Sequence, residues 1–554
     1  MASQQLFPQR VRDPKILLRI FQTANRRPIQ MRRDLRHLRQ HVGEMLSLRH
    51  ALSSCFFQKT VSHIASQRFT QQNHRTVFLL APIGIPLAFS IDHLIPGYAL
   101  GFLLGSLGLT FLAVRLRKRE GRADVTAHVY GNNVPAIIAY TLAIVLPVYL
   151  QTHDAITAWQ AGAAAVIWTG IIKLAAAGFA GMFRRFIPVP ASMSVFGAAM
   201  YSYLALVLLQ RLFDQPLVGI VALAIVAVSV LGNVPITRWR IPPFIVAWTV
   251  PLLVGWLIGY VHPVWQGATI RMRFVASLGP LRSLALAVPY LSVIAPIAIY
   301  QILQDIASVE GANAAGDNYD ARAIVACDAV ATLLCGAAGS VVTPVVYALH
   351  PPYKAMGARI GFALWTPIIL LLVVTSGLTL FIAQLFPWPI LAAMIAYVSV
   401  GVGIATLRRV DRKYLSAVLL GFVLPAGAVV AAAVNSALPA LKLSAANPDV
   451  QIALNRSIYW SSVQGLGSGF LFLVLVVTAL ITEVIDRNFG RASLWCLVAS
   501  VFSWFGLMHS PIFRWGAQPA YAEGWIAAAV IVYSARWWRG DLPTPNPPAP
   551  TQSV

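Results

Sequence analysis

The sequence predicts an all-α polytopic membrane protein with about 14–16 spans, and three observations carry that prediction. The chain is 58% hydrophobic and only 11% charged, whereas soluble domains carry roughly 25% charged residues. Apolar runs long enough to cross about 30 Å of hydrocarbon recur, for example at 95–114, 359–386 and 469–485. Short basic patches alternate with pairs of these runs, as expected when Lys and Arg stay on the cytoplasmic side.

The first 76 residues are basic and contain no run long enough to span a membrane. They hold 14 Lys and Arg residues against Asp13, Asp34 and Glu44. Such a segment can lie on anionic lipid, serve as an organellar transit peptide, or stand in place of the native start of the fold. The residues alone leave all three open. At the other end, 541–554 is Pro-rich and is predicted to be a disordered tail.

The net charge of +23 lies in this extension and in short patches between apolar runs, which indicates membrane orientation rather than nucleic-acid binding. We therefore expect the lipid bilayer as a partner and no nucleic acid. Both termini are expected in the cytoplasm of a cell whose inner (plasma) membrane holds the chain. The patches assigned to the cytoplasmic side are 115–122, Arg184 and Arg185, 238–240, 408–413, 487–491 and 536–540.

Two stretches predict interruptions within spans. At 126–138 the letters GNNVP precede an apolar run, and at 343–361 three prolines surround a Val/Tyr/Leu segment too short to span. Irregular backbone is tolerated in a membrane only where protein or a water-filled cavity surrounds it. Paired interruptions, one in each half of a transporter, are a pointer to the substrate site.

Acidic side chains gather near the second interruption, where an unpartnered charge in the bilayer costs several kcal/mol. Glu310 precedes a patch of small residues, and a carboxylate there can exchange a proton or bind the N–H groups of a heterocycle. Asp328 lies in the next apolar run and is either functional or a structural hydrogen-bond partner. Asp317 and Asp320, with Arg322, are expected in a solvated cytoplasmic turn.

We expect no cofactor, no metal and no enzymatic activity. The four cysteines (Cys55, Cys327, Cys335, Cys496) have no metal-binding or redox spacing. The sequence also shows no nucleophile elbow and no phosphate loop.

The stretches 121–140 and 308–361 resemble the nucleobase–cation symporter and nucleobase–ascorbate transporter group, nearest its xanthine/uracil permease-like members. The likeness runs from about 84–97 to 494–510. It implies two inverted seven-span repeats, divided into a core and a gate domain, with short strands at two broken helices that cross at the substrate site. It also implies uptake of a nucleobase such as xanthine, uracil or hypoxanthine, or of a similar small heterocycle, driven by protons or another cation. Relatives often form homodimers through the gate domain, so a homodimer is an assembly that the resemblance allows.

On this basis the chain divides into five parts. They are 1–76, a basic N-terminal extension; 77–270, the first repeat; 274–437, the core part and start of the second repeat; 438–540, the remaining spans; and 541–554, the tail.

The resemblance also implies a set of site residues. Glu310 matches an essential glutamate that binds the base and takes part in proton coupling, and we add Asp328 as a second proton-coupling acid. His350 is either a donor to the substrate or a cap of the half-helix. The expected substrate-binding residues are Glu310, Tyr130, Asn132, Asn133, Tyr347 and His350.

Two alternatives to a nucleobase symporter remain. A same-fold anion transporter would bind its anion at the positive starts of the two half-helices, against which the acid at Glu310 argues. A non-transporting pseudo-permease is the other, because the expected first span at 62–85 is apolar only from Thr76 onward. Arg68 and Arg75 would lie in hydrocarbon there, at roughly 2–3 kcal/mol each.

Overall fold

The computed structural model confirms a helical, multi-pass membrane protein with two short strands at broken helices. The basic extension 1–76, the expected first span 62–85 and the tail 541–554 lie outside the described residues. The structure describes residues 95–538, apart from 180–185, 233–242, 263–278, 348–349, 356, 377–384, 386, 442 and 444–446.

Seven helices in the described residues are long and apolar enough to cross a membrane. They are Pro96–Glu120, Val134–Thr152, Ala155–Ala177, Val189–Leu212, Leu284–Ala314, Trp388–Arg408 and Arg412–Asn435. Trp460–Gly467 and Phe470–Ile485, which meet at 76°, form an eighth if they count as one broken span. Three shorter apolar helices, Pro216–Ser229, Ile245–Leu257 and Phe362–Val373, are also present, and the expected total of about 14–16 spans stays a prediction for the whole chain.

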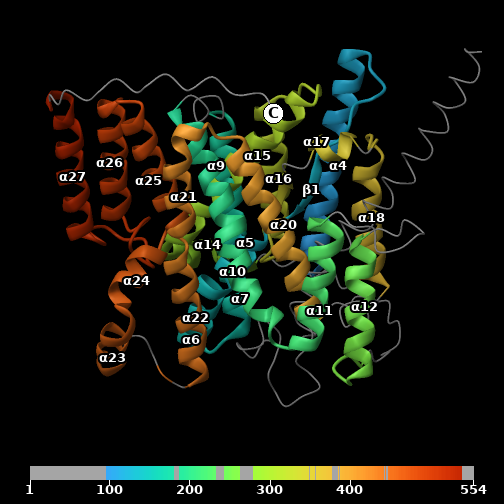
Figure 1. Cartoon of the computed structure of the whole chain (residues 1–554), viewed down its shortest axis with the longest axis horizontal. Coiled ribbons are helices and arrows are strands. Elements are labelled where there is room, and N and C mark those ends of the chain that lie inside the picture. Colours follow the sequence, from blue (N-terminus) through green and yellow to red (C-terminus); the bar gives the residue numbers. More distant parts are fainter. Residues whose placement is uncertain are drawn as a thin grey trace, which may run out of the picture.

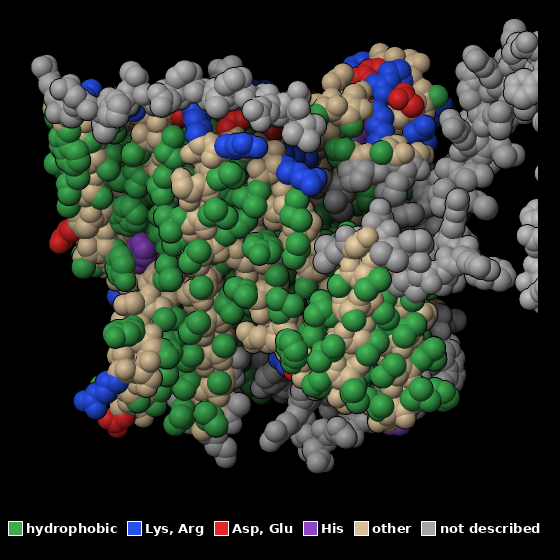
Figure 2. All heavy atoms as spheres, in the orientation of Figure 1, with side chains coloured by type: hydrophobic (Ala, Val, Ile, Leu, Met, Phe, Trp, Pro, Cys, Tyr) green, Lys and Arg blue, Asp and Glu red, His purple; other side chains and the backbone are tan. Residues whose placement is uncertain are grey.

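The surface has the distribution of side chains that a bilayer requires. Hydrophobic side chains cover the flank seen in Figure 2, while Lys and Arg gather along its upper edge. Helix α4 (Ile95–Glu120) reaches this edge in Figure 1 and ends in Arg117, Lys118 and Arg119. Phe111, on the same helix, is 65% exposed, as expected for a side chain that faces lipid.

The two strands pair at the centre of one bundle. Strand β1 (Val129–Asn132) runs antiparallel to β2 (Pro344–Tyr347), with Tyr130 opposite Val346 and Gly131 opposite Val345. Each strand lies in one of the two stretches that the sequence marks as interruptions, so both expected interruptions are confirmed.

The bundle that surrounds the strands is the core domain. Its helix α16 packs against α7 and α4, and α15 packs against α7 and β2. An aromatic cluster that includes Tyr98, Phe102, Tyr130 and Tyr347 fills the space around the strands. The core helices are α4, α7 (Ala155–Ala177), α15 (Leu291–Ala314), α16 (Ala321–Ala337) and α18 (Phe362–Thr375).

The second bundle is the gate domain. Helices of the two halves of the chain alternate in it, because α9 packs on α21 and α25, and α10 and α11 pack on α20. Gly421 permits a close approach there, since a Cβ atom would lie 2.1 Å from Ser194 Oγ. The helices are α9 (Val189–Gly197), α10 (Ala205–Leu212), α11 (Pro216–Val226), α12 (Pro243–Leu257), α20 (Trp388–Arg408), α21 (Leu415–Val423), α22 (Ala426–Ala440), α24 (Trp460–Gly467) and α25 (Phe470–Ile485).

Two further helices extend the gate side. Helices α26 (Phe489–Trp504) and α27 (Pro519–Ser534) pack on each other, and α26 packs on α25, so the three stand in a row at one end of Figure 1. The remaining elements are α5 (Val134–Tyr140), α6 (Leu146–Thr152), α13 (Gly279–Arg282), α14 (Leu284–Ala287), α17 (His350–Ala355), α23 (Pro448–Ile458), π turns at Thr141–Val145, Ala198–Leu204 and Ala227–Leu231, and 3₁₀ turns at Val288–Tyr290, Arg412–Tyr414 and Ala535–Trp537.

Candidate functional site

The strand crossing and the start of a helix form the centre of the candidate site. Strand β1 ends at Asn132, and a helix of 19 residues, Val134–Thr152, begins directly after it through α5, a π turn and α6. Gly131 lets the strands approach, because a Cβ atom there would lie 2.1 Å from the Tyr347 ring. The positive end of a helix dipole therefore lies at the crossing, inside the core domain.

Asn133 caps this helix with its side-chain oxygen, and its side-chain N–H₂ group remains without a partner among the described residues. Its Oδ1 accepts a hydrogen bond from the backbone N–H of Ala136 at 3.0 Å, and its own backbone N–H donates to Thr343 O at 2.9 Å. Because Oδ1 is used by the cap, the Nδ2 group turns away from the helix axis. Nδ2 is buried and has no hydrogen-bond partner among the described residues. The helix start thus presents a buried N–H₂ donor.

Two other expected residues meet Asn133 at the crossing. The Asn132 side chain accepts a hydrogen bond from the hydroxyl of Tyr98 on α4, and its backbone carbonyl accepts one from the Tyr347 hydroxyl. All of these residues are buried. The structure therefore brings Asn132, Asn133 and Tyr347 together, with Asn132 and Tyr347 bonded to protein groups.

Tyr130 and Asp328 lie behind the crossing and form a different group. The Tyr130 ring stacks on Phe102, and its hydroxyl donates to Asp328 Oδ1 at 2.6 Å. The ammonium of Lys173, on α7, donates to Asp328 Oδ2 and, at 3.1 Å, to Gln301 Oε1. The Lys173 side chain is fully buried. Sequence reasoning missed Lys173, although a lysine within the apolar run 155–177 was the signal that could have found it.

Helix α15 presents a polar stripe to β2 that does not include Glu310. Gln301 Nε2 donates to Thr343 Oγ1 at 3.0 Å, Ser308 Oγ donates to Tyr347 O at 2.8 Å, and Asp305 lies between them near the Val346 backbone. The spacing i, i+4, i+7 places these three on one helix face, a signal that the sequence carried and that we overlooked.

Glu310 lies about 200° around the helix from Ser308, at 100° per residue. It is half-buried near the end of α15. A Cβ atom at its neighbour Gly311 would meet the Pro351 ring at 3.6 Å and Arg409 Nη2 at 3.8 Å. Glu310 therefore does not belong to the stripe that faces β2.

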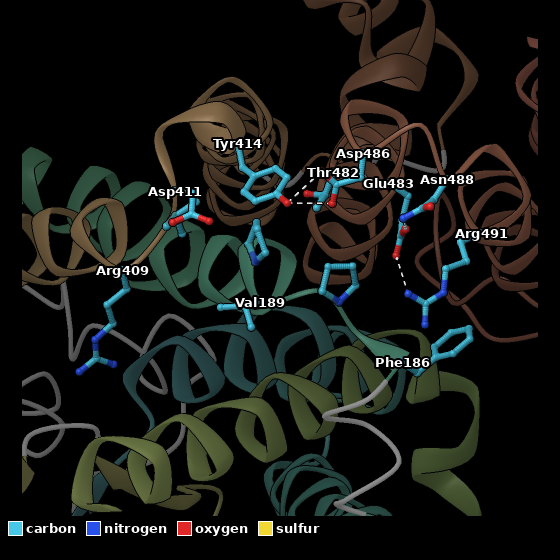
Figure 3. A pocket seen from close by; sticks show the side chains of 13 residues that line it. Phe186, Val189, Arg409, Asp411, Tyr414, Thr482, Glu483, Asp486, Asn488 and Arg491 are labelled. Carbon is cyan, nitrogen blue, oxygen red and sulfur yellow. Dashed lines mark hydrogen bonds and ion pairs between the residues drawn. The ribbon is translucent and has the colours of Figure 1, made fainter. Parts of the chain in front are cut away.

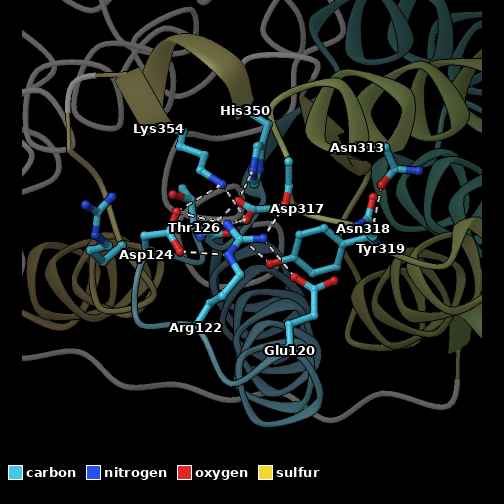
Figure 4. A network of polar contacts seen from close by, with 12 residues as sticks. Glu120, Arg122, Asp124, Thr126, Asn313, Asp317, Asn318, Tyr319, His350 and Lys354 are labelled. Carbon is cyan, nitrogen blue, oxygen red and sulfur yellow. Dashed lines mark hydrogen bonds and ion pairs between the residues drawn. The ribbon is translucent and has the colours of Figure 1, made fainter.

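His350 joins a cluster on the polar side of the core domain, shown in Figure 4. Its Nε2 lies 2.9 Å from Asp317 Oδ2, and Asp317 Oδ1 accepts hydrogen bonds from Lys354 Nζ at 2.5 Å and Arg122 Nη2 at 3.1 Å. The backbone N–H of Thr126 adds a further bond at 3.1 Å. The expectation that Asp317 is solvated is wrong, since its side chain has no exposed area.

The electrostatics of this cluster follow from its contacts. Burial alone would raise the pKa of Asp317, but hydrogen bonds from His350, Lys354 and the Thr126 backbone lower that pKa to about 2. The hydrogen bond between Arg122 and Asp124 raises the guanidinium pKa further. Asp320 is exposed, as expected, and accepts a hydrogen bond from the backbone N–H of Arg322 at the start of α16. Asp317 is thus a permanent anion that ties together the loop after α4, the loop before α16, and α17.

A separate pocket opens on the gate domain, as Figure 3 shows. It has a volume of about 420 Å³ and is lined by both signs of charge, including Arg409, Asp411, Glu483, Asp486 and Arg491. Arg491 Nη1 lies 3.6 Å from Glu483 Oε1, so these charges already pair within the protein. Because the pocket is lined by both signs of charge, it favours neither a cation nor an anion.

Potential metal ligands in the described part of the chain are scattered. No group of three or more His, Cys, Asp or Glu side chains there could hold a metal ion. Cys327, Cys335 and Cys496 are free thiols, and Cys55 lies outside the described residues.

These features define a multi-pass membrane protein with two broken helices around a central crossing, an arrangement found in secondary transporters. No known protein family and no characterised protein sequence matches the chain.

Two similar solved structures illustrate the fold. The transmembrane domain of a cyanobacterium bicarbonate transporter, BicA, is 15% identical, with a TM-score of 0.39, over 64% of this chain and 97% of that one. SLC26A9 is 13% identical, with a TM-score of 0.42, over 82% of this chain and 65% of that one. The expected membership of the nucleobase permease group is wrong, because the structural neighbours are of this BicA and SLC26 kind.

Proposed function

We propose that the chain is a secondary transporter that carries a small anion across a membrane. The observation that carries this proposal is the unpartnered Nδ2 donor of Asn133 at the start of the helix Val134–Thr152. Backbone N–H groups and the positive end of the dipole make a helix start favourable for negative charge. A buried donor without a partner costs about 1–3 kcal/mol, which a bound acceptor would recover.

The position of Glu310 removes the objection that the sequence raised against an anion. Its side chain starts about 200° around α15 from Ser308, which contacts β2. A carboxylate on that side repels an anion at the crossing less than one that faces it. Asn133 is also only 2% exposed, so an anion bound to it would have to give up most of its water, and the cargo that we propose is a small anion such as chloride, bicarbonate or sulfate.

Transport would use the two-bundle architecture. The core domain holds the crossing, and its movement against the gate domain would expose the anion to each side in turn. We assign the edge at which α4 ends, with Arg117, Lys118 and Arg119, to the cytoplasm because basic residues are retained there. A bacterial inner membrane remains the proposed location.

The test is uptake of chloride, bicarbonate and sulfate into liposomes that contain the purified chain, compared between wild type and Asn133→Ser. Serine keeps an oxygen that can cap the helix but lacks the N–H₂ group. We expect one anion to be carried, and Asn133→Ser to weaken its uptake about tenfold or more, since a hydrogen bond to a charged group contributes roughly 1.5–3 kcal/mol.

The matched control is Asn447→Ser. The side-chain oxygen of Asn447 caps α23 by accepting a hydrogen bond from the backbone N–H of Asp449 at 2.9 Å. Asn447 is exposed and lies far from the crossing in the sequence. We expect its uptake to equal that of the wild type. Folded protein that carries none of the three anions, or an Asn133→Ser variant that carries its anion as well as the wild type, would contradict the proposal.

A further inference from the structure

Three ionisable side chains meet inside the core domain, each from a different helix. Lys173 lies on α7, Asp305 on α15 and Asp328 on α16, and none of the three side chains has any exposed area. This cluster is separate from the Asn133 donor and from the Asp317 cluster described above. If all three side chains were ionised, this buried cluster would carry a net charge of −1, which is unfavourable away from water.

Lys173 and Asp328 form a well-satisfied ion pair. The Lys173 ammonium donates directly to Asp328 Oδ2 and also to Gln301 Oε1 at 3.1 Å. The other oxygen of Asp328 accepts the Tyr130 hydroxyl at 2.6 Å. One positive and one negative charge cancel here, and each has the additional hydrogen bonds that burial requires.

Asp305 has no such support. Neither of its carboxyl oxygens makes a hydrogen bond of regular geometry to the described residues, and the groups beside them are the Asp328 carboxyl and the Val346 backbone. Its nearest cation is Lys173, whose Nζ lies 3.6 Å from Asp305 Oδ2 and is already committed to Asp328. If Asp305 were ionised, the cluster would carry one uncompensated negative charge in a site without water-exposed atoms, which is strongly unfavourable.

We propose that Asp305 carries a proton and that this proton is the ion coupled to transport, an inference that rests on the function proposed above. In the uptake step Asp305 is a neutral carboxylic acid beside the neutral Lys173–Asp328 pair. On release, the O–H bond of Asp305 breaks, its electron pair stays on the carboxylate, and the proton leaves to water. The carboxylate that remains has Lys173 Nζ 3.6 Å away but shares that one ammonium with Asp328, so the deprotonated cluster carries a net negative charge and is the less stable state.

The surroundings of Asp305 contain few other groups that could take this role. Besides Lys173 and Asp328, the ionisable side chains of the described residues that act on the cluster are Tyr130 from β1 and the thiols Cys327 and Cys335 from α16. The contact from β2 comes from the Val346 backbone, which does not titrate. Of the two carboxyl groups, Asp305 is therefore the one whose protonation costs less free energy, because Asp328 would lose its ion pair with Lys173.

A chain of hydrogen bonds links the cluster to the proposed anion site. Lys173 donates to Gln301, Gln301 donates to Thr343 Oγ1 at 3.0 Å, and the Thr343 carbonyl accepts the backbone N–H of Asn133 at 2.9 Å. Loss of the proton draws Lys173 towards Asp305 and adds a negative charge to the same core domain. Both changes disfavour an anion at Asn133, so proton and anion are expected to bind together.

The first test observes the proton without transport. Infrared difference spectra of the purified protein are recorded between pH 5 and 9 for wild type, Asp305→Asn and the matched exposed variant Asp449→Asn. We expect a protonated carboxyl band in wild type and in Asp449→Asn, and its loss in Asp305→Asn. Asparagine has the shape and neutrality of the protonated acid, so that variant is expected to fold. A wild-type spectrum without the band across this range would overturn the proposal.

The second test measures coupling in liposomes. We expect wild-type anion uptake to be about tenfold faster at pH 5.5 than at pH 7.5, within the range usual for coupling between two sites. In Asp305→Asn this ratio should fall to about one, with exchange of internal for external anion retained, whereas Asp305→Glu should restore the pH dependence. Uptake that follows sodium at fixed pH, or an unchanged ratio in Asp305→Asn, would overturn proton coupling at this site.

The two proposals fail in different ways. A carboxyl band that depends on Asp305, together with no uptake of any anion, refutes anion transport and leaves the proton in place. Anion uptake that depends on Asn133 but not on pH or Asp305 refutes the coupling alone.

Discussion

Removal of the charge at Asp317 should destabilise the core domain by a measurable amount. The Asp317→Asn variant leaves Arg122, Lys354 and His350 without their shared carboxylate, whose side chain is fully buried. The folded pKa of Asp317 is about 2, against an ordinary value of 3.8. At about 1.4 kcal/mol per pKa unit, the ionised carboxylate contributes roughly 2–3 kcal/mol to stability at neutral pH.

The pH dependence of this contribution has a definite sign. Because the folded pKa is lower than the unfolded pKa, the stabilisation is fully present above about pH 4 and is lost as pH falls towards about 2. The difference in unfolding temperature between wild type and Asp317→Asn should therefore be constant from pH 7 to pH 5. It should then narrow as the pH is lowered to 3.

The assay is the apparent unfolding temperature in detergent, followed by tryptophan fluorescence at one fixed heating rate. We expect Asp317→Asn to unfold about 5 °C lower than wild type at pH 7, using roughly 2 °C per kcal/mol. Asp320→Asn is the matched control, since Asp320 is an exposed cap of α16 and asparagine caps equally well. If both variants unfold at the wild-type temperature, the buried carboxylate does not hold the cluster together and the argument fails.

Three further substitutions test other parts of the core and gate. Lys173→Met should lower the yield and unfolding temperature of the folded protein sharply, because removing one partner of a buried ion pair typically costs 3–5 kcal/mol; an unfolding temperature equal to wild type would argue against the pair. Gly131→Ala should abolish uptake in folded protein, because the added Cβ atom would lie 2.1 Å from the Tyr347 ring and would displace it. Gly361→Ala should transport normally, because a Cβ atom there has no other atom within 4 Å. Lys413→Met should leave the unfolding temperature unchanged, because Lys413 is 56% exposed and exposed ion pairs contribute little; a clear drop would contradict this.

The sequence predicted those features that depend on composition and local backbone chemistry. Hydropathy identified a multi-pass helical protein, and the letters GNNVP and the prolines near 344–352 marked both broken helices, because Gly and Pro act on the backbone where they stand. The expectation that Asn132, Asn133 and Tyr347 lie in the site had a different ground, the family resemblance, and their role in binding stays a prediction. The family was not predicted correctly, since short runs of small and acidic residues fit more than one group of similar architecture.

Tertiary structure decided which charges meet and which are buried. Lys173 and Asp328 are 155 residues apart and Arg122 and Asp317 are 195 apart, so no local pattern pairs them. Asp317 stands in a polar loop that looked solvated, yet α17 and the loop after α4 enclose it. Hydropathy and turn chemistry act within a few residues, whereas burial and ion pairing depend on which helices pack together. The sequence by itself therefore determined the membrane architecture and its two breaks, and the packing of α7, α15 and α16 determined that Lys173, Asp305 and Asp328 meet.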